Sequence, residues 1–244
     1  MGESLGIWRL AQDDSIMPHI DACNVAAGFH ASDPSTLART VALAHKTGTA
    51  IGAHPGMPDL VGFGRRPMLL TPEEVADIIT YQVGAVQAFC HRSGAQLSHV
   101  KPHGFLYFYL LQKQEICEAA VQAIKVFNVP MYGLPGTIHE SVCKEHGVEF
   151  VPEVFADCEY TSGGDLVSPT KSKPISPQEC AERVRVVAHE GRNYAQGGSQ
   201  EQASVDMKLD GRRFSVCLHS DLPGAVENVH AVREMIDRLN SRAA

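Results

Sequence analysis

The sequence predicts an α/β protein in which helices cover a parallel β-sheet. Three observations support this prediction. Short apolar segments typical of buried strands alternate along the 244 residues with amphipathic segments of helical period. The connections between these segments are short, as in the crossover units of a parallel sheet. Hydrophobic residues make up 44% of the chain, which is enough for a large core.

The first predicted strand is the apolar run 20–29, and a helix follows it. Asp33 stands where a side chain can cap this helix, and Gly48 stands where a residue without a β-carbon closes it. A second short strand at 49–54 leads into a loop at 55–70 that is rich in Gly and Pro.

The next helix begins with a capping box. Thr71 is suited to cap the helix and Glu74 to bond back to it, and apolar residues at helical spacing continue to about Gly94. The remaining predicted elements are a strand at 96–102, a helix at 113–127, a strand at 129–135, a helix ending at Gly147, a strand at 148–156, a loop at 157–175, a helix from Ser176, a strand at 212–219 and a helix from about Pro223. This gives about six strands. We see no linker or internal repeat and predict one domain over residues 1–244.

Composition narrows the classes of function. The net charge is -7 and no basic run is present, so we expect neither a nucleic acid nor an anionic membrane surface as partner. No apolar run approaches the roughly 20 residues of a spanning helix, and the N-terminus lacks a signal-peptide pattern. The seven Cys residues form no CxxC pair, which predicts buried, reduced thiols in a cytoplasmic protein.

Histidines stand at the ends of four predicted strands. His30, His54, His103 and His219 each close or directly follow an apolar, strand-like run. In closed barrels of parallel strands, functional side chains gather at the carboxyl ends of the strands, so we expect these four to share one rim. Imidazole groups there are suited to proton transfer or to metal binding.

The segment "HVKPHG" (99–104) is the most informative of these motifs. Lys101 and His103 alternate and therefore point to the same side of a strand. A lysine directed into an apolar interior is costly unless it is paired or used. We therefore expect Lys101 to polarise a substrate carbonyl and His103 to transfer protons. His99 lies deeper on the same face and is interpreted as a core histidine.

Other candidate residues each have a structural alternative. Arg65 and Arg66 are suited to holding a carboxylate, or they belong to a solvated turn. Asp33 and Asp221 are either supporting carboxylates or helix caps. Gly28 lets the backbone approach a ligand. The candidate substrate-binding residues further include Asn24, Glu153, Asp157, and two aromatic residues in what we expect to be a strand-to-loop segment, Phe105 and Phe108.

Five motifs together resemble the LamB/YcsF (lactam-utilisation) family: "NVAAGFHASDP", "IGAHPGMPDLVGFGRRPM", "HVKPHG", "EVFAD" and "CLHSDLPGA". They occur in order over nearly the whole chain. The resemblance, which extends to the A-type subunit of 5-oxoprolinase, implies a seven-stranded β/α barrel of the glycoside hydrolase/deacetylase type. It also implies ATP-dependent opening of a lactam, with B- and C-type partner subunits supplying the phosphorylation.

The sequence departs from the family pattern at its start. The family's first strand reads D-L-N-C-D-L-G-E, and only Gly2 and Glu3 correspond to it here. We therefore expect the first strand of the barrel to be missing. In related barrels an early Asp completes a metal site. Without it, a divalent ion would depend on His30, His54 and His103.

The sequence also departs from the family at presumed pocket positions. Phe105 and Phe108 stand where the family has Ala and Asn, Cys158 stands for an Arg, and Ser220 stands for a Gly. Loss of an amide and a guanidinium, with gain of two aromatic rings, predicts a substrate larger or less polar than 5-oxoproline.

Three functions stay open. The first is a carbonyl-directed enzyme that cleaves a lactam or related cyclic amide, in which His30 and His54 orient the substrate or bind a metal. The second is a stand-alone hydrolase, decarboxylase or other lyase of a small-molecule pathway, which needs neither ATP nor partner subunits. The third is a catalytically inactive binding or scaffold subunit, whose open sheet edge is covered by a partner or by a second copy in a homo-oligomer.

Overall fold

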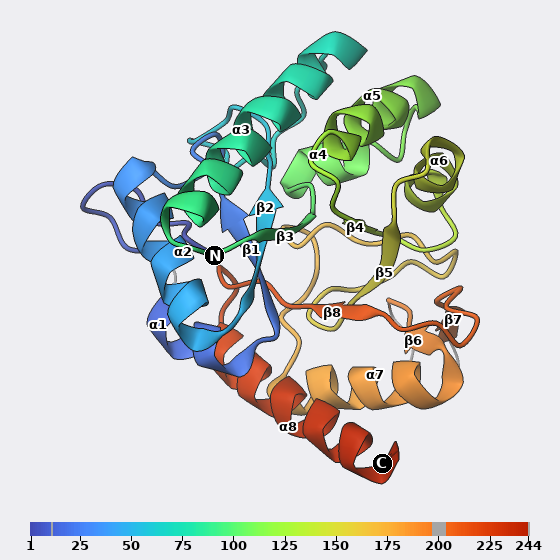
Figure 1. Cartoon of the computed structure of the whole chain (residues 1–244). Coiled ribbons are helices and arrows are strands. Elements are labelled where there is room, and N and C mark those ends of the chain that lie inside the picture. The colour runs from blue at the N-terminus through green and yellow to red at the C-terminus, as the bar shows by residue number, and fades with distance from the viewer. Residues whose placement is uncertain (11, 197–203, 244) are drawn as a thin grey trace. The chain divides into compact units, whose positions relative to one another are not determined.

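The structure, a computed structural model, describes residues 1–10, 12–196 and 204–243. It has the predicted α/β architecture, with a sheet of six strands in the order β1-β2-β3-β4-β5-β8 (Figure 1). A separate antiparallel pair joins β6 to β7. A seventh strand and a closed barrel are not among the described elements, so that part of the fold stays a prediction.

The chain forms two compact units, Met1–Val151 and Pro152–Ala244. The single domain over residues 1–244 stays a prediction. The first unit contains, in chain order, α1 (Asp13–Ile16), the 3-10 helix η1 (Met17–His19), β1 (Ala22–Ala26), α2 (Pro34–Thr47), β2 (Ala50–His54), α3 (Pro72–Arg92), β3 (Leu97–Val100), α4 (Gly104–Tyr109), α5 (Gln114–Lys125), β4 (Met131–Gly133) and α6 (Ile138–His146).

Parallel pairing brings the carboxyl ends of the first three strands to one edge. Ala26 at the end of β1 lies opposite His54 at the end of β2, and Ala53 lies opposite Val100 at the end of β3. The residues that follow these strands therefore emerge side by side.

The helix boundaries follow the predicted signals. Thr71 and Glu74 form the capping box of α3, and Gly48 ends α2 with a φ of 75°. The prediction was wrong for the residues after His103, because the expected loop is the short helix α4. Its run of aromatic and leucine side chains has no turn residue after Gly104, and three of its residues are buried.

Asp33 confirms the capping alternative for its carboxylate. One oxygen accepts the backbone N–H groups of Ser35 and Thr36 at 2.9 and 3.2 Å. The other accepts the Thr36 hydroxyl at 2.6 Å and the backbone N–H of Gly6 at 2.9 Å. These hydrogen bonds, that of the Thr36 hydroxyl first, hold the pKa of Asp33 well below its usual range.

The N-terminal residues run along β1. The Met1 ammonium donates to the carbonyl of Asn24 at 2.8 Å, and the N–H of Ala26 donates to the Met1 carbonyl at 3.0 Å. Glu3 is buried in consequence. Gly2 and Glu3 thus lie beside β1 without forming a strand of their own, and the missing first strand stays a prediction.

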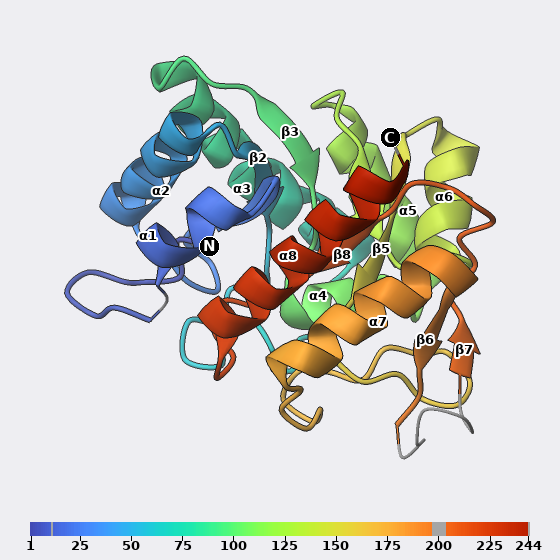
Figure 2. The ribbon, with the colours of Figure 1, turned by 90° about the horizontal axis from the view of Figure 1, so that it is seen from below.

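The second unit is built on the parallel pair β5–β8 and two long helices. Its elements are β5 (Phe150–Phe155), which begins just before the unit boundary, α7 (Pro177–Glu190), β6 (Arg192–Tyr194), β7 (Ser204–Asp206), β8 (Ser215–Cys217) and α8 (Ala225–Ala243). Helices α7 and α8 lie side by side (Figure 2). Cys180 and Val184 of α7 and Val232 of α8 are buried in one apolar cluster. The hairpin β6–β7 was not predicted.

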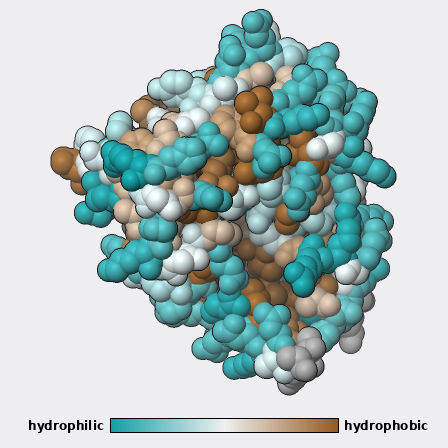
Figure 3. Space-filling model, viewed as in Figure 1, coloured by the Kyte–Doolittle hydropathy of each residue, from teal (hydrophilic) through white to brown (hydrophobic). Residues whose placement is uncertain are grey.

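The burial of the cysteines, the polarity of the surface and the length of the helices can be compared with the predictions made from composition. All seven cysteines are buried thiols, as predicted. The face in Figure 3 is largely hydrophilic, with apolar residues between the polar ones. In the parts of the chain that the structure describes, every helix is too short or too polar to cross a membrane.

Replacing Gly52 tests the close packing inside the sheet. A β-carbon added at Gly52 would overlap the imidazole ring of His99 on β3. Gly52→Ala is expected to lower the free energy of unfolding by about 1–3 kcal/mol through overpacking. Gly84→Ala, in the middle of α3 where an added β-carbon meets nothing, is expected to raise it by about 0.5–1 kcal/mol. Urea denaturation of both variants checks the pair, and equal effects would contradict the packing argument.

The cap at Asp33 makes a prediction about pH. Because its folded-state pKa is depressed, the cap contributes its full stability above the unfolded pKa of about 3.9 and loses it as the pH falls toward the folded value. Asp33→Ala is expected to cost about 1 kcal/mol at pH 7. The difference from the parent protein should shrink as the pH falls from about 4 to 2. A difference that stays constant over this range would mean that the carboxylate does not act as a charged cap.

Candidate functional site

Three of the four strand-end histidines come together in the first unit. The rings of His30 and His103 are stacked, with centroids 3.7 Å apart and planes 10° apart. His54 meets His103 edge-on with centroids at 4.8 Å. His30 and His103 are 1% and 3% exposed. The strand-end pattern therefore located these three correctly, while His219 belongs to the second unit.

Hydrogen bonds link two of these rings in a chain between backbone carbonyls. Nε2 of His103 lies 2.8 Å from the carbonyl oxygen of Phe63. Nδ1 of His103 lies 3.1 Å from Nε2 of His54. Nδ1 of His54 lies 2.6 Å from the carbonyl oxygen of Lys101.

The number of protons on the two rings follows from these three contacts. A carbonyl oxygen only accepts, so Nε2 of His103 and Nδ1 of His54 must both carry hydrogen. Two neutral imidazoles have no further N–H for the contact between the rings. A third proton is needed there, and the pair then carries one positive charge.

His54 is the acceptor in the contact between the rings. Burial lowers the pKa of His54 well below its usual value, and the positive charges of His103 and Lys101 lower it further. Burial and the charge of His103 do the same to His30. His54 is therefore neutral and accepts at Nε2 from the Nδ1–H of His103.

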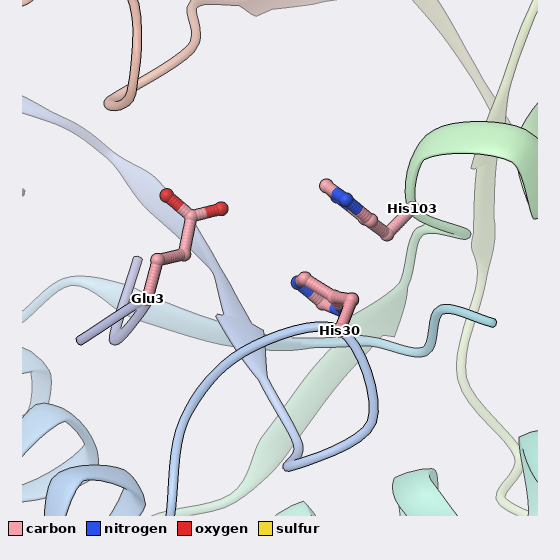
Figure 4. Close-up of side chains that lie close together, drawn as sticks. All are labelled: Glu3, His30 and His103. Atoms are coloured by element: carbon pink, nitrogen blue, oxygen red, sulfur yellow. The ribbon is translucent and has the colours of Figure 1, made fainter. Parts of the chain in front are cut away.

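A carboxylate and an unbonded imidazole lie beside this pair. Glu3, His30 and His103 each offer a ligand atom, and these atoms all lie within 4.8 Å of one another (Figure 4). Both ring nitrogens of His30 are buried without a hydrogen-bond partner, although such groups are normally satisfied. The sequence prediction placed His54 rather than Glu3 in the metal set. The family-like pair Gly2-Glu3 was the available signal for Glu3.

Lys101 is buried, and its charge acts on neighbouring histidines. It is 4% exposed and contributes to the lowered pKa values of His54 and His99. Burial, as the main cause, lowers the pKa of His99 to about 3. His99 lies 2.9 Å from Oδ1 of Asn24 and stacks on Tyr132 with centroids at 4.0 Å. His99 is thus a core histidine, as interpreted, and Asn24 holds it.

The glycine-rich loop folds onto the histidine cluster. A β-carbon added at Gly64 (φ +63°) would lie 2.7 Å from Cβ of His30 and 2.9 Å from Cδ2 of His103, so only glycine fits there. Arg66 forms a bidentate ion pair with the buried carboxylate of Asp59. Arg65 lies over the Phe63 ring at 5.0 Å. Of the two predicted carboxylate-binding arginines, Arg66 already has a carboxylate partner inside the loop.

The other predicted residues of the first unit to be located are Gly28, Phe105 and Phe108. Gly28 adopts a φ of 94° in the turn after β1. Phe105 stacks on Tyr109 with centroids at 5.6 Å, and Phe108 meets Tyr107 edge-on at 5.9 Å. Phe105 and Phe108 are half-buried and three residues apart, so they share one face of α4.

The second unit contains the remaining predicted residues. Glu153 is buried in β5, and Asp221 is half-buried in the turn before α8. Asp157 is buried, and its Oδ1 lies 3.0 Å from Nδ1 of His219. Burial alone would raise the pKa of Asp157, but the charge and hydrogen bonds of His219 outweigh it and the pKa is lowered. Asp157 thus holds a histidine in place, and its predicted role in substrate binding stays a prediction.

Comparisons with known proteins agree over the whole chain. The description "LamB/YcsF family" matches residues 1–244. The lactam utilization protein lamB of Emericella nidulans is 39% identical, covering 99% of this chain and 94% of its own length. The A-type subunit of 5-oxoprolinase from Pyrococcus abyssi is 38% identical, covering 97% and 91%. The crystal structure of the lactam utilization protein from Thermus thermophilus superimposes with a TM-score of 0.88 at 38% identity, covering 98% of this chain and 94% of that one. The chain therefore belongs to the LamB/YcsF family.

Proposed function

We propose that this chain is a carbonyl-directed enzyme that cleaves a 5-oxoproline-like lactam or a related cyclic amide. The observation that carries the proposal is the cluster of Glu3, His30, His54 and His103 in the first unit, in which His54 is half-buried and the other three are buried, with the buried Lys101 beside it. Such a cluster concentrates acid, base and positive charge in a poorly hydrated site. Relatives named for lactam utilization and as A-type subunits of 5-oxoprolinase support the substrate class.

Lys101 and His103 take the principal roles. The Lys101 ammonium polarises the ring carbonyl and stabilises the negative charge that develops on its oxygen. The Nε2–H of His103, which now donates to the Phe63 carbonyl, is the proton that the ring nitrogen takes as water adds to the carbonyl carbon and the C–N bond breaks. Phe63 has a φ of 54°, which is unfavourable for an aromatic residue. A substrate carbonyl that replaces this acceptor lets the strained loop relax.

His54 controls the proton of His103. Its Nδ1–H is held by the Lys101 carbonyl, so only its Nε2 is able to receive a proton from His103. As the pKa of His54 is depressed, the proton stays on His103 until the substrate takes it. The Lys101 backbone thus links the carbonyl-polarising residue to the proton donor.

In place of the extra proton on His103, the residues fit a divalent metal ion. The unbonded nitrogens of His30 and the nearby Glu3 carboxylate are suitable ligands, and Nε2 of His103 completes the set. With that nitrogen as a ligand, the proton count closes with both imidazoles neutral, because each then has one N–H to donate. A bound ion would supply Lewis-acid polarisation of the carbonyl.

We further propose that ATP acts through partner subunits of the B and C type. The naming of relatives of similar length as the A-type member of a multi-subunit 5-oxoprolinase supports this assignment. Partner subunits would supply the phosphorylation that the family resemblance implies, and this chain would supply the ring-opening step. Turnover without ATP and partners would instead favour the stand-alone hydrolase.

Variants of the two principal residues test the mechanism. Lys101→Met and His103→Gln are each expected to lower kcat for 5-oxoproline about 10²–10⁴-fold, measured with ATP and partner subunits present. His139→Gln is the matched control, because His139 is also fully buried and is held by the Tyr107 carbonyl in the same unit. It should reduce stability but preserve kcat of the folded protein. Full turnover by both principal variants would refute the assignment.

Phe108 tests the proposed change in substrate preference. Phe108→Asn restores the amide that the family pattern has at this position and should shift binding toward small polar lactams. A buried polar group that loses its partner costs about 1–3 kcal/mol, so relative affinity should change by about one order of magnitude or more. Competition between 5-oxoproline and an aromatic ring acid measures the shift. An unchanged ratio would mean that Phe108 only packs within α4.

A further inference from the structure

The second unit contains a cluster of three different metal-ligating groups that the proposed function does not use. Oδ1 of Asp157 lies 3.0 Å from Nδ1 of His219. Sγ of Cys158 lies 3.6 Å from that oxygen and 3.7 Å from that nitrogen. A carboxylate, a thiol and an imidazole therefore present one atom each to a common triangle.

The dimensions of this triangle match one face of a tetrahedral zinc site. Zinc binds thiolate sulfur at about 2.3 Å and histidine nitrogen or carboxylate oxygen at about 2.0–2.2 Å. Tetrahedral angles between such bonds separate the donor atoms by roughly 3.3–3.6 Å. The three observed separations lie within a few tenths of an ångström of these values, so a shift of side chains alone accommodates the ion.

The surrounding structure holds the three groups in place. The N–H of His219 donates to Oδ2 of Asp157, which leaves Oδ1 directed at the imidazole and the thiol. The guanidinium of Arg183 donates to the Cys158 carbonyl at 2.8 Å and pairs with Glu179 at 2.9 Å. Its positive charge is thus balanced by its own partner. A carboxylate and a thiolate would together neutralise a doubly charged ion.

The donor types select the metal. A thiolate with an imidazole favours zinc and similar borderline ions over Mg²⁺ and Ca²⁺, which prefer oxygen ligands. Asp157 and Cys158 are buried, whereas the side chain of His219 is 18% exposed. The fourth position therefore opens on the His219 side, where solvent is able to complete the tetrahedron.

We propose that Asp157, Cys158 and His219 form a binding site for a zinc-class divalent cation, with its fourth position taken by water or a small anion. The site is independent of the lactam chemistry proposed for the first unit. Its defining feature is the thiolate. The first-unit group of Glu3, His30 and His103 has only nitrogen and oxygen donors.

Cobalt substitution tests the site, because a thiolate bound to Co²⁺ gives a near-ultraviolet charge-transfer band that nitrogen and oxygen ligands do not give. Titration of the full chain, freed of metal by a chelator, should produce this band with saturation at one equivalent, and Zn²⁺ should abolish it. Cys158→Ser should remove the band. Cys180→Ser, a matched control with a buried thiol in the same unit, should retain it.

The remaining outcomes are equally decisive. His219→Gln is the second variant, in case Cys158→Ser does not fold. It keeps the thiolate and changes only a partly exposed ring. It should weaken Co²⁺ binding at least about tenfold. Absence of the band in the parent protein, or its persistence in Cys158→Ser, would overturn the proposal. Cobalt absorption in the visible range without the near-ultraviolet band would locate the metal at the first-unit group alone, which rejects this site and leaves the proposed function standing.

Discussion

The proposed chemistry of the first unit depends on a shortage of protons between two rings, that of the buried His103 and that of the half-buried His54. His54 and His103 are held between two backbone carbonyls that can only accept, so the pair needs either a third proton or a metal ion in place of one hydrogen bond. Burial makes the third proton costly. The arrangement is therefore poised to lose that proton or to gain a ligand, and both are useful in a site that acts on a carbonyl.

The backbone around the rings is fixed by contacts within the protein. The Phe63 carbonyl is placed by a loop that the ion pair of Asp59 and Arg66 closes. Gly64 brings the loop against both rings. His99 fills the space over Gly52, and Asn24 holds it. Arg66 and Asn24, which the sequence suggested as ligand-binding residues, thus hold neighbouring parts of the protein in place around the histidine rings.

The sequence was sufficient for features that follow from local rules. Capping residues predicted the starts of α2 and α3, and strand ends predicted the meeting of His30, His54 and His103, because parallel strands finish at one edge. It was insufficient where a contact depends on the folded path of a loop or on residues outside the predicted elements. The role of Arg66 depends on Asp59 in a folded loop, and Glu3 precedes every predicted strand. The strands β6 and β7 are three residues each and carry polar side chains, so they have little periodicity to detect.

The segment that carries Glu3 is anchored at three points. Met1 is bonded to β1, the N–H of Gly2 to the Asp13 carboxylate at 2.8 Å, and the N–H of Gly6 to the carboxylate of Asp33. Each anchor shortens the stretch of chain that is free to fluctuate, so the conformational entropy of this segment is lost when the protein folds rather than when a ligand arrives. The Glu3 carboxylate is consequently preorganised, and the affinity of the cluster for the proposed metal or substrate would be set in part by backbone groups that do not contact it.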